Sequence, residues 1–267
     1  MIGYTNKVRK KTPFTRAGNF LLAIVVPIII IIFWELIVAQ GVVNKNLVPP
    51  PSKLWTTFIG LISSGKLQTA LSVSFNRVFA GFFIAAAIGI VFGFIIGLFE
   101  PINKALSSII NILRPIPTIA LIPIFIIVLG IGESANISII TIGALWPILL
   151  NTTAGVLSVD RKLMELAYVY RIGKLKVVFQ IILPSAMYSM ITGLRLGIGG
   201  AWMSVVAAEM IGATSGIGYM IMFAKSLAQA ANMYVLVLVI GIIGLIIDRV
   251  LLLFQNIIRK RFLAIES

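Results

Sequence analysis

The feature that most constrains this chain is a series of long apolar segments, because a helix needs about 20 apolar residues to cross a bilayer. Hydrophobic residues make up 60% of the 267 residues and charged residues only 11%. We therefore expect an all-α membrane protein with six transmembrane helices, over 21–38, 78–99, 105–129, 135–157, 185–211 and 233–254. A cleaved signal peptide is the alternative for the first segment, but its apolar run is long and no good cleavage site follows.

The charges orient these helices. Lysine and arginine outnumber aspartate and glutamate by 22 to 8, a formal net charge of +14. With the N-terminus and the C-terminus both cytoplasmic, fourteen basic residues lie inside and five outside, as the positive-inside rule requires. The basic excess therefore marks topology and not nucleic-acid binding. The outer five are Lys45, Lys53, Lys66, Arg77 and Lys225.

This topology divides the chain into a basic cytoplasmic arm (1–18), a first transmembrane helix (19–40), an extracytoplasmic segment (41–76), a five-helix core (77–257) containing a cytoplasmic loop (158–183), and a cytoplasmic tail (258–267). The second span carries a small residue at every fourth position, which predicts a close approach by another helix. These residues are Gly81, Ala85, Gly89, Gly93 and Gly97.

Several kinds of chemistry are excluded by what the sequence lacks. It has no histidine and no cysteine, which removes Ser-His and thiol nucleophiles and zinc sites of the Cys/His type. It also has no Gly-x-x-x-x-Gly-Lys-Ser/Thr loop for phosphates, so ATP hydrolysis would have to come from a partner. We expect no cofactor and no metal in this chain.

The loop at 158–183 predicts a short helix outside the bilayer. Asp160 is a plausible N-cap, and apolar residues follow at helical spacing. Such a face needs a partner; the alternative is a helix that rests on the membrane surface. The residues that repeat are Leu163, Ala167 and Tyr170, and also Met164 and Tyr168.

Glu165, Leu166 and Ala167, followed by Ile182, Leu183 and Pro184, resemble the EAA loop of permeases of binding-protein-dependent type I ABC importers. Other stretches resemble the nitrate, sulfonate, taurine and bicarbonate subfamily. They are residues 47–52, 114–123, 130–133, 193–195, 201–202 and 207–210, so the similarity runs from about Val48 to the C-terminus. One departure concerns the residue six positions after the glutamate. The family has glycine there, whereas this chain has Arg171, with Gly173 two residues later.

The resemblance implies a permease fold of the methionine-importer type in a prokaryotic plasma membrane. It implies a second permease copy, a pair of cytoplasmic ATPase subunits that bind ATP and magnesium, and an extracytoplasmic solute-binding protein. The loop helix would be the coupling helix that docks on the ATPase. The coupling residues would be Asp160, Leu163, Met164, Glu165, Ala167, Tyr168, Arg171 and Gly173.

Charges within the spans are candidates for a solute path, because ionised groups in a bilayer usually face an interior. Counting the helical rise from the cytoplasmic side puts Arg114 roughly 14 Å deep and Arg195 roughly 16 Å deep. Two guanidinium groups at similar depth would suit a small anion such as a sulfonate or nitrate. Structural roles are the alternative, and for Glu209 we favour helix pairing over a gate. The candidate path residues are Arg114, Pro117, Arg195, Trp202 and Glu209.

Two rival functions remain. In an ion-coupled secondary transporter, the intramembrane acids Glu35, Glu209 and Asp248 would serve coupling. An intramembrane enzyme is disfavoured because histidine and a suitably paired set of acids are missing. The identity of the solute is not encoded in any of these residues.

Overall fold

The computed structural model describes the backbone of residues 13–263 and the side chains of residues 24–258, and the described chain consists of helices joined by short turns. This confirms the all-helical fold. The first helices are α1 (Pro13–Ala39), α2 (Pro51–Ser63), α3 (Lys66–Leu98), α4 (Glu100–Leu113), α5 (Thr118–Leu129) and α6 (Glu133–Leu157). The later ones are α7 (Arg161–Val169), α8 (Lys174–Val177), the π-helical turn η1 (Val178–Ile182), α9 (Leu183–Gly212), α10 (Ile217–Ser226) and α11 (Ala230–Leu263).

Four helical segments are long and apolar enough to cross a membrane: α3, α6, the continuous stretch Lys174–Gly212, and α11. The α4–α5 pair passes the same test together but bends by 96°. Of the expected first span, the apolar part with described side chains is Ile24–Ala39, and residues 21–23 lie outside the described side chains. α3 begins at Lys66 and not at Val78, so the second spanning helix extends well before its expected start.

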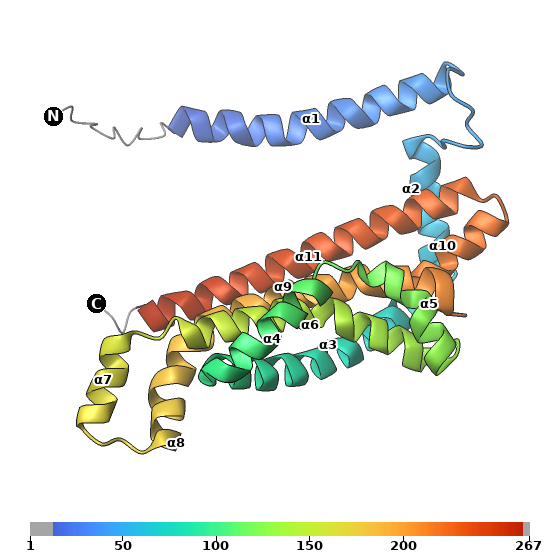
Figure 1. Ribbon diagram of the computed structural model, residues 1–267. Coiled ribbons are helices and arrows are strands. Elements are labelled where there is room, and N and C mark those ends of the chain that lie inside the picture. The colour runs from blue at the N-terminus through green and yellow to red at the C-terminus, as the bar shows by residue number, and fades with distance from the viewer. Residues whose placement is uncertain (1–12, 264–267) are drawn as a thin grey trace.

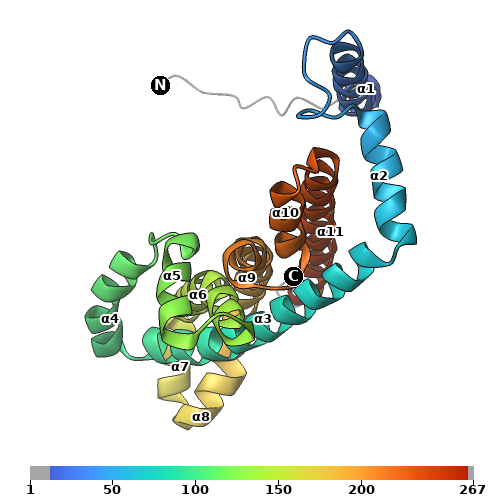
Figure 2. The same cartoon turned by 90° about the vertical axis from the view of Figure 1, so that its right-hand side faces the viewer.

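The centre of the bundle is α6, which packs closely against both α3 and α9 (Figures 1 and 2). The predicted small-residue stripe of α3 faces α6 and is confirmed as a close-packing surface. A Cβ added at Gly81 would lie 2.6 Å from Ile140 Cγ2, and one at Gly97 would lie 2.6 Å from Val156 Cβ. The glycines therefore allow a separation that any side chain would prevent.

The molecule has two ends of different character (Figure 1). α7 and α8 project from one end, where α1 also begins and α11 finishes. The other end is formed by α2, α10 and the start of α3. Most of α1 lies apart from the bundle, and its last turns make the contacts. Trp34 packs against Tyr234 of α11, with ring centroids 6.1 Å apart, and the Glu35 carboxylate accepts hydrogen bonds from the Ser52 amide (3.0 Å) and hydroxyl (2.8 Å).

Candidate functional site

The helix that projects from the bundle, α7, is held at both ends by specific hydrogen bonds. Asp160 is its N-cap, as predicted, and its carboxylate accepts from the Lys162 amide at 2.9 Å. At the other end the Arg171 amide donates to Tyr168 O (3.0 Å) and the Ile172 amide to Ala167 O (2.9 Å). This pair of bonds is the Schellman arrangement, which requires a left-handed residue after the helix.

Arg171 is that residue, with φ of 52°. The family glycine falls at the same position, so the chain keeps the turn while replacing the residue that adopts it without strain. Gly173, by contrast, has φ of −61° and needs no glycine for its conformation. A Schellman turn therefore forms here although arginine stands where the family has glycine.

Most of the side chains of α7 are exposed, including the apolar ones. Only Ala167 is buried, at 3% exposure, where it faces α8 and η1. The exposed fraction reaches 86% for Tyr168 and 72% for Val169. Glu165 is also exposed and lies beside Met164 and Tyr168 around a shallow hollow. All eight predicted coupling residues are thus brought together on α7 and its two flanking turns.

The predicted path residues are not brought together. Arg114 and Pro117 line one hollow of about 550 Å³ at the bend between α4 and α5, with Trp146 and Asn151 of α6 on the opposite wall. The expected third span is not one straight helix, because α4 and α5 meet at a bend of 96° just after Arg114. The depth expected for Arg114 stays a prediction.

Arg195 lies outside this hollow and is paired with α11. Its guanidinium donates to Asp248 at 2.8 Å and to Gln255 Oε1 at 3.0 Å, and Gln255 in turn donates to the Thr192 hydroxyl at 2.7 Å. Asp248 of α11 is therefore the ion-pair partner of Arg195. These bonds tie α9 to α11.

Trp202 is in the core, at 4% exposure. Its indole packs against Phe75 with ring centroids 5.3 Å apart, and its Nε1–H donates to Ile240 O at 3.2 Å. In the described chain it faces neighbouring helices and no hollow.

Glu209 belongs to a buried cluster that sequence reasoning missed. Arg77, which the charge count assigned to the outer side, is buried, since only 3% of it is exposed. Arg77 donates to Glu209 at 2.8 Å, to Glu133 at 2.8 Å through Nε and again through Nη2, and to Ser215 O and Oγ at 2.7 and 3.0 Å. All five of its N–H groups are engaged.

The carboxylate of Glu209 is 1% exposed and has two further donors. The Ser74 hydroxyl lies at 2.8 and 2.9 Å from its two oxygens, and the Gly218 amide, at the N-terminus of α10, donates at 2.9 Å. The cluster thus joins α3, α6, α9 and α10 at the end opposite α7. One signal in the sequence pointed to it: Arg77 is the only charged residue between Lys66 and Glu100.

Comparisons with known proteins decide the family. Residues 87–264 match the family described as "Binding-protein-dependent transport system inner membrane component". The chain belongs to this family. It is therefore a permease subunit of an ABC importer, a multi-pass protein of the inner membrane, and not itself an enzyme, because the ATPase activity of such importers resides in a separate subunit.

Two curated relatives extend over nearly the whole permease. A putative aliphatic sulfonates transport permease protein of Bacillus subtilis is 33% identical over 95% of this chain and 91% of its own length. A bicarbonate transport system permease protein of Synechocystis is 33% identical over 91% of this chain and 90% of its own length. A chain of the methionine ABC transporter MetNI in an inward-facing conformation has the same fold, with a TM-score of 0.64 at 19% identity over 73% of this permease and 96% of that chain.

Proposed function

We propose that this permease forms the membrane path of an ATP-driven importer for a small anionic solute, which an extracytoplasmic binding protein delivers. The observation that carries the proposal is α7, a helix with capped ends and an exposed apolar surface that no other described element covers. Exposed tyrosine and aliphatic side chains on a fixed helix are typical of a surface that a protein partner buries. We assign that partner as the ATPase, with ATP and magnesium bound there.

The connection from α7 to the rest of the bundle favours mechanical coupling. Residues 174–212 form one helical segment, from α8 through η1 into α9. Ala167 packs at the start of this segment, together with Val178 and Ile182 around a small hollow. A displacement of α7 would therefore be transmitted to α9, and through the tight α6–α9 contact to the centre of the bundle.

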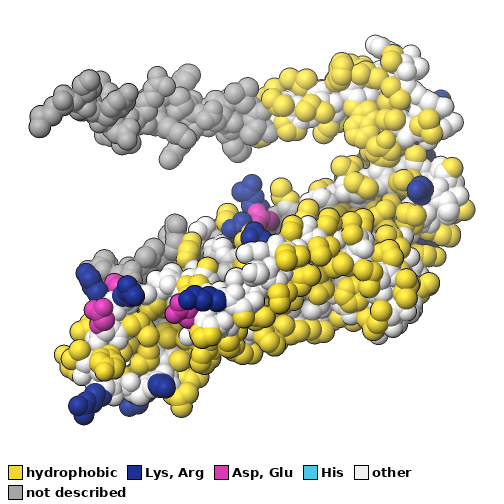
Figure 3. Space-filling model, viewed as in Figure 1, with side chains coloured by type: hydrophobic (Ala, Val, Ile, Leu, Met, Phe, Trp, Pro, Cys, Tyr) yellow, Lys and Arg dark blue, Asp and Glu magenta, His cyan; other side chains and the backbone are white. Residues whose placement is uncertain are grey.

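The charge distribution supports a cytoplasmic position for α7. Lysine and arginine side chains gather at the end of the molecule that carries α7 and α8 (Figure 3). Among them are Arg161, Lys162, Arg171, Lys174 and Lys176, all within or beside these two helices. By the positive-inside rule this end faces the cytoplasm, which puts both termini on that side.

The class of solute is inferred from the relatives and from one hollow. The two curated relatives carry names that specify sulfonates and bicarbonate, both anions. The hollow at the α4–α5 bend has Arg114 as its one charged lining residue, with Thr118 and Asn151 as hydrogen-bonding neighbours. We assign Arg114 and Pro117 to the solute path. This hollow is not fully enclosed, and we assign the completion of its wall to a second permease copy.

The rival function, an ion-coupled secondary transporter, is disfavoured by the partners of its three acids. Glu35 is bonded to Ser52, Asp248 to Arg195, and Glu209 to Arg77 and Ser74. A carboxylate that exchanges a coupling ion must be free to change its partners during transport. These three carboxylates serve instead as links between helices.

Reconstitution into proteoliposomes with the cognate ATPase and binding protein tests the proposal. Uptake that needs both ATP and the ATPase supports it, whereas uptake driven by an ion gradient alone would overturn it. The variant Glu165→Lys should insert normally but separate ATP hydrolysis from uptake. Glu100→Lys is the matched control, because Glu100 is an exposed acid on α4 whose only ion pair among the described side chains is with Lys104. If Glu165→Lys transports normally, α7 is not the coupling element.

A further inference from the structure

Another hollow, of about 510 Å³, lies at the end of the molecule opposite α7. It is bounded by the turn between α2 and α3, by α10 and by the start of α11. The hollow adjoins the last turn of α2, and Figure 1 shows α2 lying across the end of α11. No residue assigned to the solute path lines it.

α2 indicates where this end meets the membrane boundary. One face of α2 is buried through Leu54 and Leu61, which pack in a cluster with residues of α10 and α11. The other face exposes Trp55 (65%), Ile59 (47%) and Ile62 (37%) at helical spacing. An amphipathic helix with an exposed tryptophan is typical of the zone between headgroups and acyl chains. The hollow begins at the last turn of this helix, so it opens at the same level.

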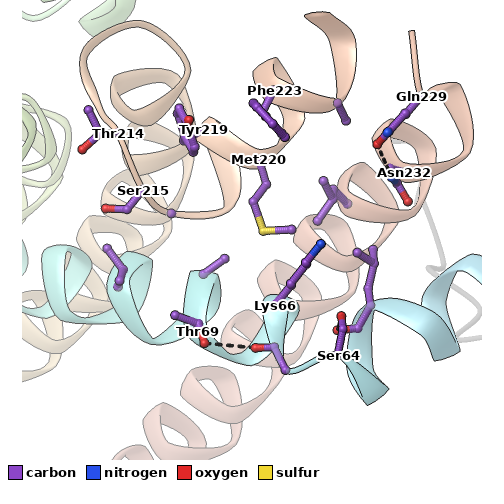
Figure 4. Close-up of a pocket in the computed structure, with 17 residues that line it drawn as sticks. Ser64, Lys66, Thr69, Thr214, Ser215, Tyr219, Met220, Phe223, Gln229 and Asn232 are labelled. Atoms are coloured by element: carbon purple, nitrogen blue, oxygen red, sulfur yellow. Dashed lines mark hydrogen bonds between the residues drawn. The ribbon is translucent and has the colours of Figure 1, made fainter. Parts of the chain in front are cut away.

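The lining of the hollow is divided into a polar and an apolar part. Figure 4 shows the Lys66 amine directed into the hollow, with the polar side chains of Thr69 and Gln229 near its rim. Met220 and Phe223 reach in from α10, and Leu236 completes the apolar wall from α11. Lys66 forms no ion pair with any described carboxylate, and no acidic residue lines the hollow.

We propose that this hollow binds one anionic phospholipid of the outer leaflet, with its phosphodiester at Lys66 and an acyl chain along Met220, Phe223 and Leu236. A single unpaired cation matches the single negative charge of a phosphatidylglycerol headgroup. The apolar wall matches an acyl chain, which a free anion lacks. The lysine and the apolar wall therefore both favour an amphipathic ligand. The position beside α2, at the membrane boundary, favours a lipid.

The site has a structural consequence. Its floor includes Ser215 and Gly216, and Ser215 is bonded to Arg77 in the buried cluster. A bound lipid would connect α3, α10 and α11 directly above that cluster. Occupancy should therefore stabilise this end of the permease, independently of which solute is carried.

Native mass spectrometry of the full-length permease in neutral detergent tests the site. Titration with dioleoyl phosphatidylglycerol should leave one tightly held lipid per chain, and the phosphatidylcholine with the same acyl chains should bind more weakly. Lys66→Gln should weaken phosphatidylglycerol binding about fivefold, the contribution of one basic residue at a membrane surface, and Lys66→Arg should restore it. Phe223→Ser should weaken the binding of both lipids.

Lys225→Gln is the matched control, because Lys225 lies on α10 but does not line the hollow. Equal phosphatidylglycerol affinity in the wild type and in Lys66→Gln would overturn the proposal. So would the absence of any retained lipid. Displacement of the lipid by millimolar inorganic phosphate would identify the ligand as a free oxyanion and would equally refute the lipid assignment.

Discussion

The buried cluster around Arg77 gives the sharpest quantitative test of how this permease is held together. Arg77 is shared by two carboxylates of different exposure: Glu209 is buried, while the Glu133 side chain is 61% exposed. Removing the arginine leaves Glu209 as a buried charge whose remaining partners, Ser74 and the Gly218 amide, are neutral. Leaving one member of a buried ion pair without its partner costs about 3–5 kcal/mol.

We therefore expect Arg77→Met to lower the free energy of unfolding by about 3–5 kcal/mol, or roughly 10 °C in midpoint for a chain of this size. Glu209→Gln should cost less, about 1–2 kcal/mol, because Arg77 keeps Glu133 and the amide can still accept a hydrogen bond. Glu133→Gln should cost at most about 1 kcal/mol, as is usual for exposed ion pairs. The double variant Arg77→Met with Glu209→Gln should be more stable than Arg77→Met alone.

Thermal and denaturant unfolding in detergent, followed on all four variants, measures these values as a double-mutant cycle. The expected interaction energy between residues 77 and 209 is about 2 kcal/mol or more, with the double variant well short of the sum of the single effects. If the two single effects simply add, or if Glu209→Gln is as damaging as Arg77→Met, then charge pairing is not what stabilises this end, and the reasoning fails.

Three further predictions concern other parts of the chain. Arg171→Gly should stabilise the end of α7 by about 1 kcal/mol, because it removes a side chain from a left-handed residue; slower hydrogen exchange of the Ile172 amide checks this, and faster exchange would contradict it. Gly81→Ala should cost about 1–3 kcal/mol in thermal unfolding, since the new Cβ would lie 2.6 Å from Ile140 Cγ2, whereas Gly60→Ala, with no neighbour within 4 Å, should cost nothing. Arg114→Gln should slow uptake roughly tenfold without lowering thermal stability. Arg195→Gln should lower both uptake and thermal stability, because Arg195 is bonded to Asp248. An equal loss of thermal stability in the two variants would contradict the assignment of Arg114 to the solute path and of Arg195 to a structural ion pair.

Several parts of the fold and the site follow from patterns within single segments. The spanning helices follow from the length of their apolar runs, the close α3–α6 packing from glycines four residues apart, and α7 from Asp160 and the apolar repeat after it. The charges near α7 predict its side of the membrane by the same local counting. In each case the signal lies in the order and composition of residues along the chain, so no knowledge of helix packing is needed.

Other features depend on segments far apart in the sequence, and only the tertiary structure decided them. Arg77 and Glu209 are separated by 132 positions, and Arg195 and Asp248 by 53. The charge count assigned both Arg77 and Lys66 to the outer side. The folded chain buries Arg77 with two carboxylates, whereas Lys66 lines a hollow and forms no ion pair with a described residue. The sequence by itself determined which segments are helical and which can lie in lipid, because burial in a bilayer depends on composition and length. Which charge meets which depends on how the helices pack, and that is a property of the folded chain alone.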